Sequence, residues 1–80
     1  MGHNLKLDSL VTFEDLNPKN VESLSIEGLV PYHKGQIVEK PVSDNPGSKL
    51  YKVVSVKDIF FSDSESVLCR RIIDLYEINR

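Results

Sequence analysis

The most reactive side-chain type in this chain of 80 residues is the thiol of Cys69, its single cysteine. A thiol acts as a nucleophile when a neighbouring base or positive charge favours the thiolate, and His33 is the candidate base. Cys69, however, lies between Val67 and Ile72 in an apolar stretch, where cysteine usually packs as a small apolar side chain. The sequence therefore favours a structural Cys69, and a small thiol enzyme is the second alternative for the function.

A metal site needs several ligands that converge, and the sequence offers few of them. Cys69, His3 and His33 show none of the short spacings by which zinc motifs are recognised. The segment 46–49 (Pro-Gly-Ser-Lys) lacks the preceding glycine of a Walker phosphate loop and is typical of a turn. We therefore expect no bound metal and no cofactor.

Carboxylates that could act as general acid and base occur in two pairs, Glu14 with Asp15 and Asp63 with Glu65. Acid–base work requires a pocket, whereas serine-rich or exposed surroundings favour capping and solvation. A chain of this length forms one domain with a thin core and has no second lobe against which a cleft could form. We expect no catalytic residue and no enzymatic activity.

Basic residues in the second half of the chain could gather into a nucleic-acid patch: Lys49, Lys52, Lys57, Arg70 and Arg71. Aromatic side chains on which bases could stack lie nearby in the sequence. Successive side chains of a strand point to opposite faces, so at most one of Arg70 and Arg71 joins any flat patch. The net charge of −2 also opposes a general attraction to phosphates. A nucleic-acid-associated small β-barrel is therefore the first alternative.

Phe60 and Phe61 directly precede the polar segment 62–66. On a strand, one ring would face inward and the other outward, and an outward phenylalanine is a natural anchor for a protein partner. In the competing interpretation, both rings cover a thin core from a loop. Together with Tyr51, these are the residues that we expect to contact a partner.

Charge and hydropathy restrict the setting of the protein. Residues 1–30 form an acidic segment with a net charge of −3, and residues 31–80 carry +1, an asymmetry that is commonly only a solvated surface. No apolar stretch approaches the roughly 20 residues needed to span a bilayer, and the first residues do not resemble a secretory signal. With a single cysteine and no disulfide framework, we expect a cytoplasmic protein without membrane contact.

The clearest local structure is a β-hairpin over residues 36–42 and 49–56, joined by a tight reversal at 43–48. Both flanking segments are rich in residues that suit a pleated sheet. Pro41 cannot donate a ladder hydrogen bond, so its strand should bulge, end or lie at an edge. The polar residues 62–66 predict a second turn.

The two ends of the chain each allow two interpretations. Apolar residues at 68, 72, 75 and 76 have helical spacing, which predicts a helix over 64–78 and an α+β fold. Strand alternation over 67–73 is favoured, because a hairpin needs a third strand for independent stability. Near the other end, Leu5, Leu7 and 10–13 predict a strand. Asn17-Pro18 predicts the start of one short helix, in competition with a strand over 21–26.

A wider strand pattern combines Gly35-x-Ile37-Val38, Tyr51-x-Val53-x-x-Val56 and the run from Val67 to Ile72. It resembles the strand rhythm of small Src-homology-3-like barrels of the KOW and Tudor type over about the last 48 residues. The resemblance implies a small antiparallel barrel closed by a final strand over 74–78. The aromatic cage of a methyl-lysine reader is not present in the pattern.

The sequence thus predicts one mainly β domain, a small antiparallel barrel or curled sheet over residues 31–80 with an N-terminal extension that carries one short helix. We expect a non-catalytic protein-interaction or regulatory module. For so short and acidic a domain, we expect a role as an adaptor or inhibitor in a phage or mobile element. The oligomeric state is left open, because an edge strand can be protected or can pair with a second copy.

Overall fold

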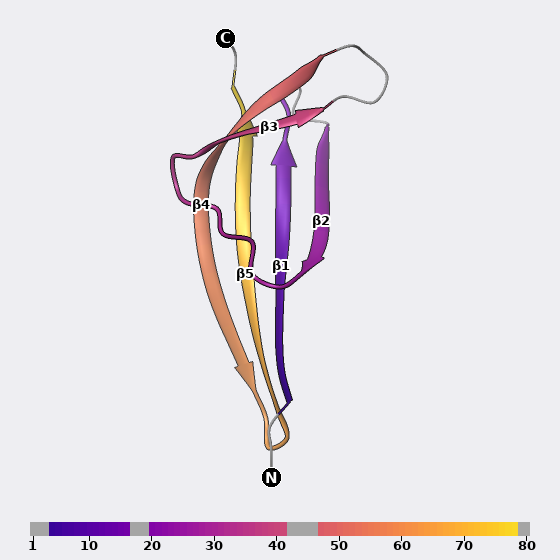
Figure 1. Ribbon diagram of the computed structural model, residues 1–80, viewed down its shortest axis with the longest axis vertical. Helices are drawn as coiled ribbons and strands as arrows, with labels where there is room; N and C mark the ends of the chain where they lie inside the picture. The colour runs from indigo at the N-terminus through magenta and orange to yellow at the C-terminus, as the bar shows by residue number, and fades with distance from the viewer. Residues whose placement is uncertain (1–3, 17–19, 42–46, 79–80) are drawn as a thin grey trace.

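The computed structural model describes residues 4–16, 20–41 and 47–78, which form one five-stranded sheet (Figure 1). The strands follow one another in the chain as β1 (Asn4–Glu14), β2 (Val21–Glu27), β3 (Ile37–Pro41), β4 (Ser48–Ser62) and β5 (Ser66–Glu77). In space their order is β2-β1-β5-β4-β3. The strand from the N-terminal segment therefore lies inside the sheet and is not an appendage to a barrel over 31–80.

The sheet is mixed. β1 runs parallel to β5 along its whole length, from Asn4 beside Ser66 to Glu14 beside Tyr76, while the other three pairings are antiparallel. The expectation of a mainly β, curled and mostly antiparallel sheet is confirmed, and the β1–β5 pairing is the parallel exception. The sheet twists and curls into a half-barrel, and its two edge strands are linked by an ion pair between Lys40 of β3 and Glu22 of β2.

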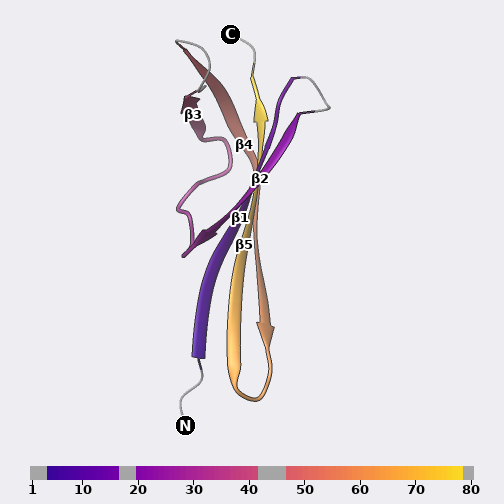
Figure 2. The same ribbon diagram turned by 90° about the vertical axis from the view of Figure 1, so that its right-hand side faces the viewer.

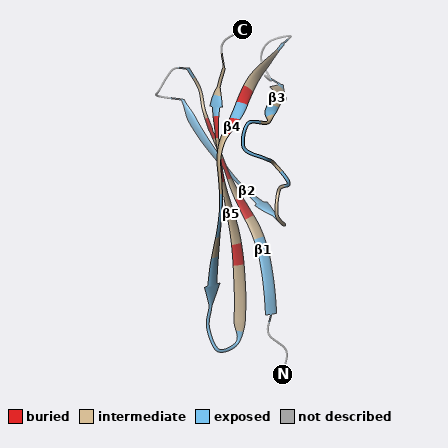
Figure 3. Cartoon of the chain, turned by 90° about the vertical axis from the view of Figure 1, so that its left-hand side faces the viewer, coloured by how far each residue is buried: buried red, intermediate tan, exposed pale blue. Residues whose placement is uncertain are grey.

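The core lies on the inner face of the half-barrel, toward the end where all five strands are present (Figure 3). Alternation along the strands brings one face of β1, β4 and β5 together there, and the phenyl ring of Phe13 meets the Tyr51 ring edge-on at 4.9 Å. A bulge between Val53 and Ser55 shifts the alternation of β4 by one residue, so that Val53 faces inward before it and Val56 after it. The buried apolar residues are Val11, Phe13, Tyr51, Val53, Ile73 and Leu75.

The segment 28–36 crosses from β2 to β3 over this inner face and packs Val30 and Tyr32 against the core. Gly28 (φ 85°) and Gly35 (φ 92°) lie near its two ends, where the chain adopts the left-handed backbone that glycine allows without strain. The Gly35 N–H donates to the Val53 carbonyl at 2.7 Å and so fastens the segment to β4. This crossover segment is the lid of the core.

Beyond the crossover segment, the first half of β1 and the β4–β5 hairpin continue as a three-stranded ribbon, which we call the arm (Figures 1 and 2). The arm gives the molecule its elongated shape, with extents of 51 × 24 × 22 Å. Its tip is the turn between Ser62 and Ser66, where the Asp63 carboxylate accepts hydrogen bonds from the N–H groups of Glu65 and Ser66. These bonds hold the pKa of Asp63 below its usual range.

Several expectations are confirmed by these elements. The hairpin of β3 and β4 forms, the turn at 62–66 is present, and Pro41 ends an edge strand. The alternative helix over 64–78 is wrong, since β5 is a continuous strand from Ser66 to Glu77 that pairs with β1 on one side and with β4 on the other. The short helix predicted after Asn17-Pro18 begins in residues outside the described part, and from Val21 the chain is a strand. The reversal at 43–48 also falls mostly outside the described residues.

The thin core predicts a sharp contrast between two neighbouring isoleucines of β5. Ile73 is 0% exposed on the inner face, whereas Ile72 points to the outer face and is partly exposed. Ile73→Ala should lower the free energy of unfolding by about 2–5 kcal/mol, because it leaves a cavity among buried neighbours. Urea denaturation of Ile72→Ala should show a clearly smaller loss; equal losses would contradict the one-sided core.

Candidate functional site

Exposed apolar side chains gather on the inner face of the arm. The strand register places Phe60, Cys69 and Leu7 in one row across β4, β5 and β1, and Ser62, Val67 and Leu5 in the next row toward the tip. The exposed fractions are 71% for Phe60, 65% for Leu5 and 40% for Leu7, while Cys69, between Phe60 and Leu7 in its row, is buried. We call Leu5, Leu7, Phe60 and Val67 the arm patch.

A polar row separates the arm patch from the core. The register places Asp58, Arg71 and Ser9 side by side, directly between the row of Phe60 and the buried row of Ile73. The Arg71 guanidinium binds both carboxylate oxygens of Asp58, at 2.8 and 3.1 Å, and holds the pKa of Asp58 below its usual range. The row therefore neutralises its own charge.

The same row fastens the crossover segment. The Arg71 guanidinium donates to the Val30 carbonyl at 3.1 Å. The hydroxyl of the fully buried Ser9 donates to the Gly28 carbonyl at 2.7 Å and accepts from the Val30 N–H at 2.9 Å. On the arm side of this row, no described segment covers the inner face of the sheet. The arm patch therefore begins where the crossover segment ends.

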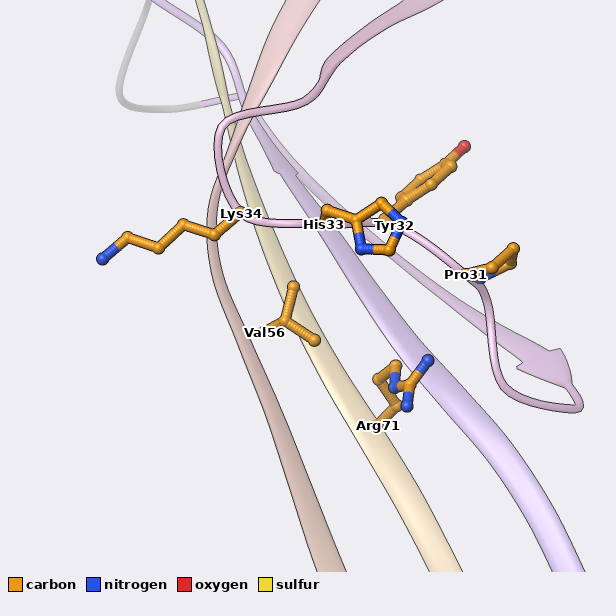
Figure 4. A pocket seen from close by; sticks show the side chains of 6 residues that line it. All are labelled: Pro31, Tyr32, His33, Lys34, Val56 and Arg71. Carbon is orange, nitrogen blue, oxygen red and sulfur yellow. The ribbon is translucent and has the colours of Figure 1, made fainter.

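A shallow cavity of about 340 Å³ lies between the crossover segment and the sheet (Figure 4). Its lining residues are Pro31, Tyr32, His33, Lys34, Val56 and Arg71. In Figure 4 the Lys34 side chain extends away from the others, while Val56 and Arg71 form the floor. The Arg71 guanidinium is already bound by Asp58 and by the Val30 carbonyl. His33 lines the cavity and Cys69 does not, so the cavity does not bring the candidate base to the thiol.

The five basic residues expected to form a nucleic-acid patch are divided between the two faces. The register places Lys52, Lys57 and Arg70 on the outer face, opposite to Lys49 and Arg71. Three of the five bind carboxylates: Arg70 binds Asp8, Arg71 binds Asp58, and Lys49 binds Asp15. The alternation of Arg70 and Arg71 is as the sequence predicts, and no single face collects all five cations.

Phe60 and Phe61 occupy opposite faces of the arm, and both are exposed. Neither ring covers the core, so the competing loop interpretation is wrong. Phe61 lies beside Leu68 on the outer face, which also carries Lys57 and Arg70. Tyr51 must be corrected as a surface residue, since its ring is buried in the core. The position of Leu5 and Leu7 on the same face as Phe60, across β5, was not predicted, because no local feature of the sequence indicates that β1 lies beside β5.

The Tyr51 hydroxyl donates to the Asp15 carboxylate, which also binds Lys49 at 2.8 Å. These three residues form a polar cluster at the end of the core away from the arm. Hydrogen bonds from Lys49 and then from Tyr51 hold the pKa of Asp15 below its usual range. Burial, followed by the hydrogen bond to Asp15, raises the pKa of Tyr51 far above its usual value. The cluster therefore stabilises a neutral tyrosine and an ionised aspartate.

Comparison with known proteins adds no family to these observations: no protein-family model matches the chain, and no curated protein or solved structure does so either. Within the described residues, no three histidine, cysteine or acidic side chains converge as metal ligands would, and His3 lies outside that part. The same residues contain no helix with the length and apolarity needed to span a membrane.

Acidification should weaken the fold partly through Asp15. A carboxyl whose pKa is lowered by folding adds stability above its ordinary pKa of about 3.9, and that stability is lost as the pH falls through the lowered value. Asp15→Asn should lower the free energy of unfolding at neutral pH by about 1–3 kcal/mol, because Lys49 and Tyr51 lose a charged acceptor. Urea titrations between pH 7 and pH 2 should also show a shallower decline for the variant. Parallel curves would contradict a role of Asp15 in the acid sensitivity.

The buried thiol gives a second measurement. Cys69 is 3% exposed beneath the arm patch, so alkylation by iodoacetamide should be at least about tenfold slower in the native protein than in urea, where no opening step is needed. Mass spectrometry over time gives both rates. Equal rates would show an accessible thiolate and would restore the thiol-enzyme alternative.

Proposed function

We propose that this chain is a non-catalytic protein-interaction module whose arm patch docks onto an apolar surface of a partner protein. The observation that carries the proposal is that exposed apolar residues lie together on the inner face of the arm, next to the covered core. Leu5 and Leu7 on β1 and Phe60 on β4 are exposed on the two sides of β5, on the same sheet face that the crossover segment covers a few residues further along.

Exposed apolar side chains that stand singly are ordinary, whereas a contiguous group marks an interaction surface. Phe60 is the best anchor of the group, because it is the most exposed and stands on a strand whose backbone is paired on the β5 side. A strand-borne aromatic ring needs little ordering on binding, since only its side-chain torsions are free. The polar row of Asp58 and Arg71 would then form one rim of the interface.

The charge distribution favours a protein over a nucleic acid as the partner. Of the five basic residues considered for a nucleic-acid patch, Lys52 and Lys57 bind no described carboxylate, but Arg70 on the same face is held by both oxygens of Asp8 at 2.9 and 3.0 Å. With a net charge of −2, the protein supplies little general attraction for phosphates. Nucleic-acid binding is therefore an outcome that the experiment below must separate from the proposal.

Three finer parts of the proposal have separate supports. The half-barrel is compatible with a Src-homology-3-like origin, for which the strand rhythm after Gly35 is the support. A cytoplasmic location is supported by the single, unpaired thiol of Cys69. For a regulatory role as adaptor or inhibitor, in a phage or mobile element, the support is the small size of the domain together with its exposed arm patch.

Opposite faces of the arm allow a matched pair of variants. Phe60→Asp places a charge in the arm patch, and Phe61→Asp places the same charge on the outer face of the same hairpin. With the chain used as bait in cells of its source, the partner retained by the wild type should be retained by Phe61→Asp and lost by Phe60→Asp. With the purified partner, Phe60→Asp should weaken binding at least about tenfold, as expected for an interface anchor.

Circular dichroism and urea denaturation establish that both variants are folded before their binding is compared. Equal loss in both variants, or loss only in Phe61→Asp, would contradict docking through the arm patch. Binding to DNA or RNA that declines steeply with salt, weakens in Lys52→Ala/Lys57→Ala and survives Phe60→Asp would replace the proposal by the nucleic-acid alternative.

A further inference from the structure

The two edges of the sheet are not equally protected. β3 is short, ends at Pro41 and carries Lys40, features that discourage pairing with another chain. β2 has seven residues without proline, lysine or bulge, and all of them are exposed. β2 is the right-hand strand of the sheet in Figure 1, and its outer edge faces the viewer in Figure 2. An unprotected edge of this kind is a template for another strand.

The hydrogen bonds at the two ends of β2 show which of its residues bond to β1 and which direct their backbone groups outward. The Gly28 N–H donates to the Leu7 carbonyl, and the Asp15 N–H donates to the Asn20 carbonyl, so the even-numbered residues of this strand face β1. The odd-numbered residues therefore direct their N–H and C=O groups outward. These residues are Val21, Ser23, Ser25 and Glu27.

The outward N–H and C=O groups of β2 can pair with the same groups of β2 in a second copy. A twofold axis through Leu24 places Ser23 opposite Ser25 of a second copy and Val21 opposite Glu27, so that all four outward residues meet outward residues. In the same register Glu22 lies opposite Ile26. No carboxylate stands directly opposite another, which would be destabilising, and Glu22 is already bound by Lys40.

We propose that β2 pairs antiparallel with β2 of a second copy, in the register centred on Leu24, and joins two half-barrels into one continuous ten-stranded sheet. The exposed apolar side chains of β2 then gain cross-strand neighbours: Val21, Leu24 and Ile26. The pairing uses backbone groups that the monomer leaves to water. It is independent of the arm patch, which lies on other strands.

Sedimentation over a range of concentrations tests the pairing. The wild type should show a monomer–dimer equilibrium, and Ser25→Pro should weaken dimerisation at least about tenfold, because proline removes an outward donor without removing a hydrogen bond to β1. Ser25→Ala is the matched control and should dimerise like the wild type. Phe60→Asp should also dimerise normally, which separates this inference from the proposed function.

Charge variants test the register and do not depend on proline being tolerated. Ser23→Glu/Ser25→Glu places carboxylates directly opposite each other across the two copies and should weaken the dimer several-fold, roughly as expected for like charges in a cross-strand pair. Within one copy these two positions face the uncharged Thr12 and Leu10 of β1. Ser23→Glu/Ser25→Lys should restore the dimer. In mixed labelled and unlabelled protein, Hα–Hα contacts between Glu22 of one copy and Ile26 of the other should be detected by NMR.

Three results would overturn the inference. A wild type that stays monomeric at every concentration tested excludes the pairing, and a dimer dissolved by Phe60→Asp but not by Ser25→Pro belongs to the arm patch. A dimer in which the charge pair gives no rescue has another register or another interface. If β2 instead binds a strand of a different protein, Ser25→Pro will abolish that complex while the free wild type remains a monomer.

Discussion

The fold depends on how far one crossover segment can cover one face of one sheet. The sheet of this chain is long. Among the residues that the structure describes, the segment that crosses its inner face is 28–36, which is held by Ser9 and Arg71. Above that polar row, inner-face side chains are buried in the core. Below it, Leu5, Leu7 and Phe60 on the same strands and the same face meet solvent, and Cys69 is the buried residue among them. Because the crossover segment covers so little of the sheet, the buried core that stabilises the fold lies in one half of the molecule. In the other half, the arm, both faces of the sheet are on the surface.

The parallel pairing of β1 with β5 gives this surface its composition. It places residues more than 60 positions apart in the sequence side by side, so that Leu5 and Leu7 stand beside Val67 and Cys69. Without it, Phe60 would be an isolated exposed ring on a hairpin. The same pairing inserts Val11 and Phe13 between the hairpin and β2, and therefore the core and the arm patch are built from the same three strands.

Local signals explain what could be predicted from the sequence. The β3–β4 hairpin, the turn after Ser62 and the edge position of Pro41 follow from residues next to one another in the chain. Non-local pairing explains the failures. No residue near Leu5 in the sequence indicates which strand its own strand will pair with. The burial of Tyr51 depends on which face of β4 becomes the inner face of the sheet, and that too is set by distant strands. The helical spacing around Leu75 was coincidental, because β5 receives hydrogen-bonded neighbours on both sides.

The candidate surfaces of the molecule are arranged so that one does not obstruct the other. A twofold axis perpendicular to the sheet at Leu24 preserves the identity of the faces, so pairing through β2 would place both arm patches on the same side of the joined sheet. The two arms would then point in opposite directions from a rigid centre, and a partner with repeated binding sites would meet two patches at a fixed spacing. Binding of the first patch would raise the effective concentration of the second, so a modest apolar contact around Phe60 could hold such a partner firmly. The small size of each patch is therefore compatible with a module that acts through pairs.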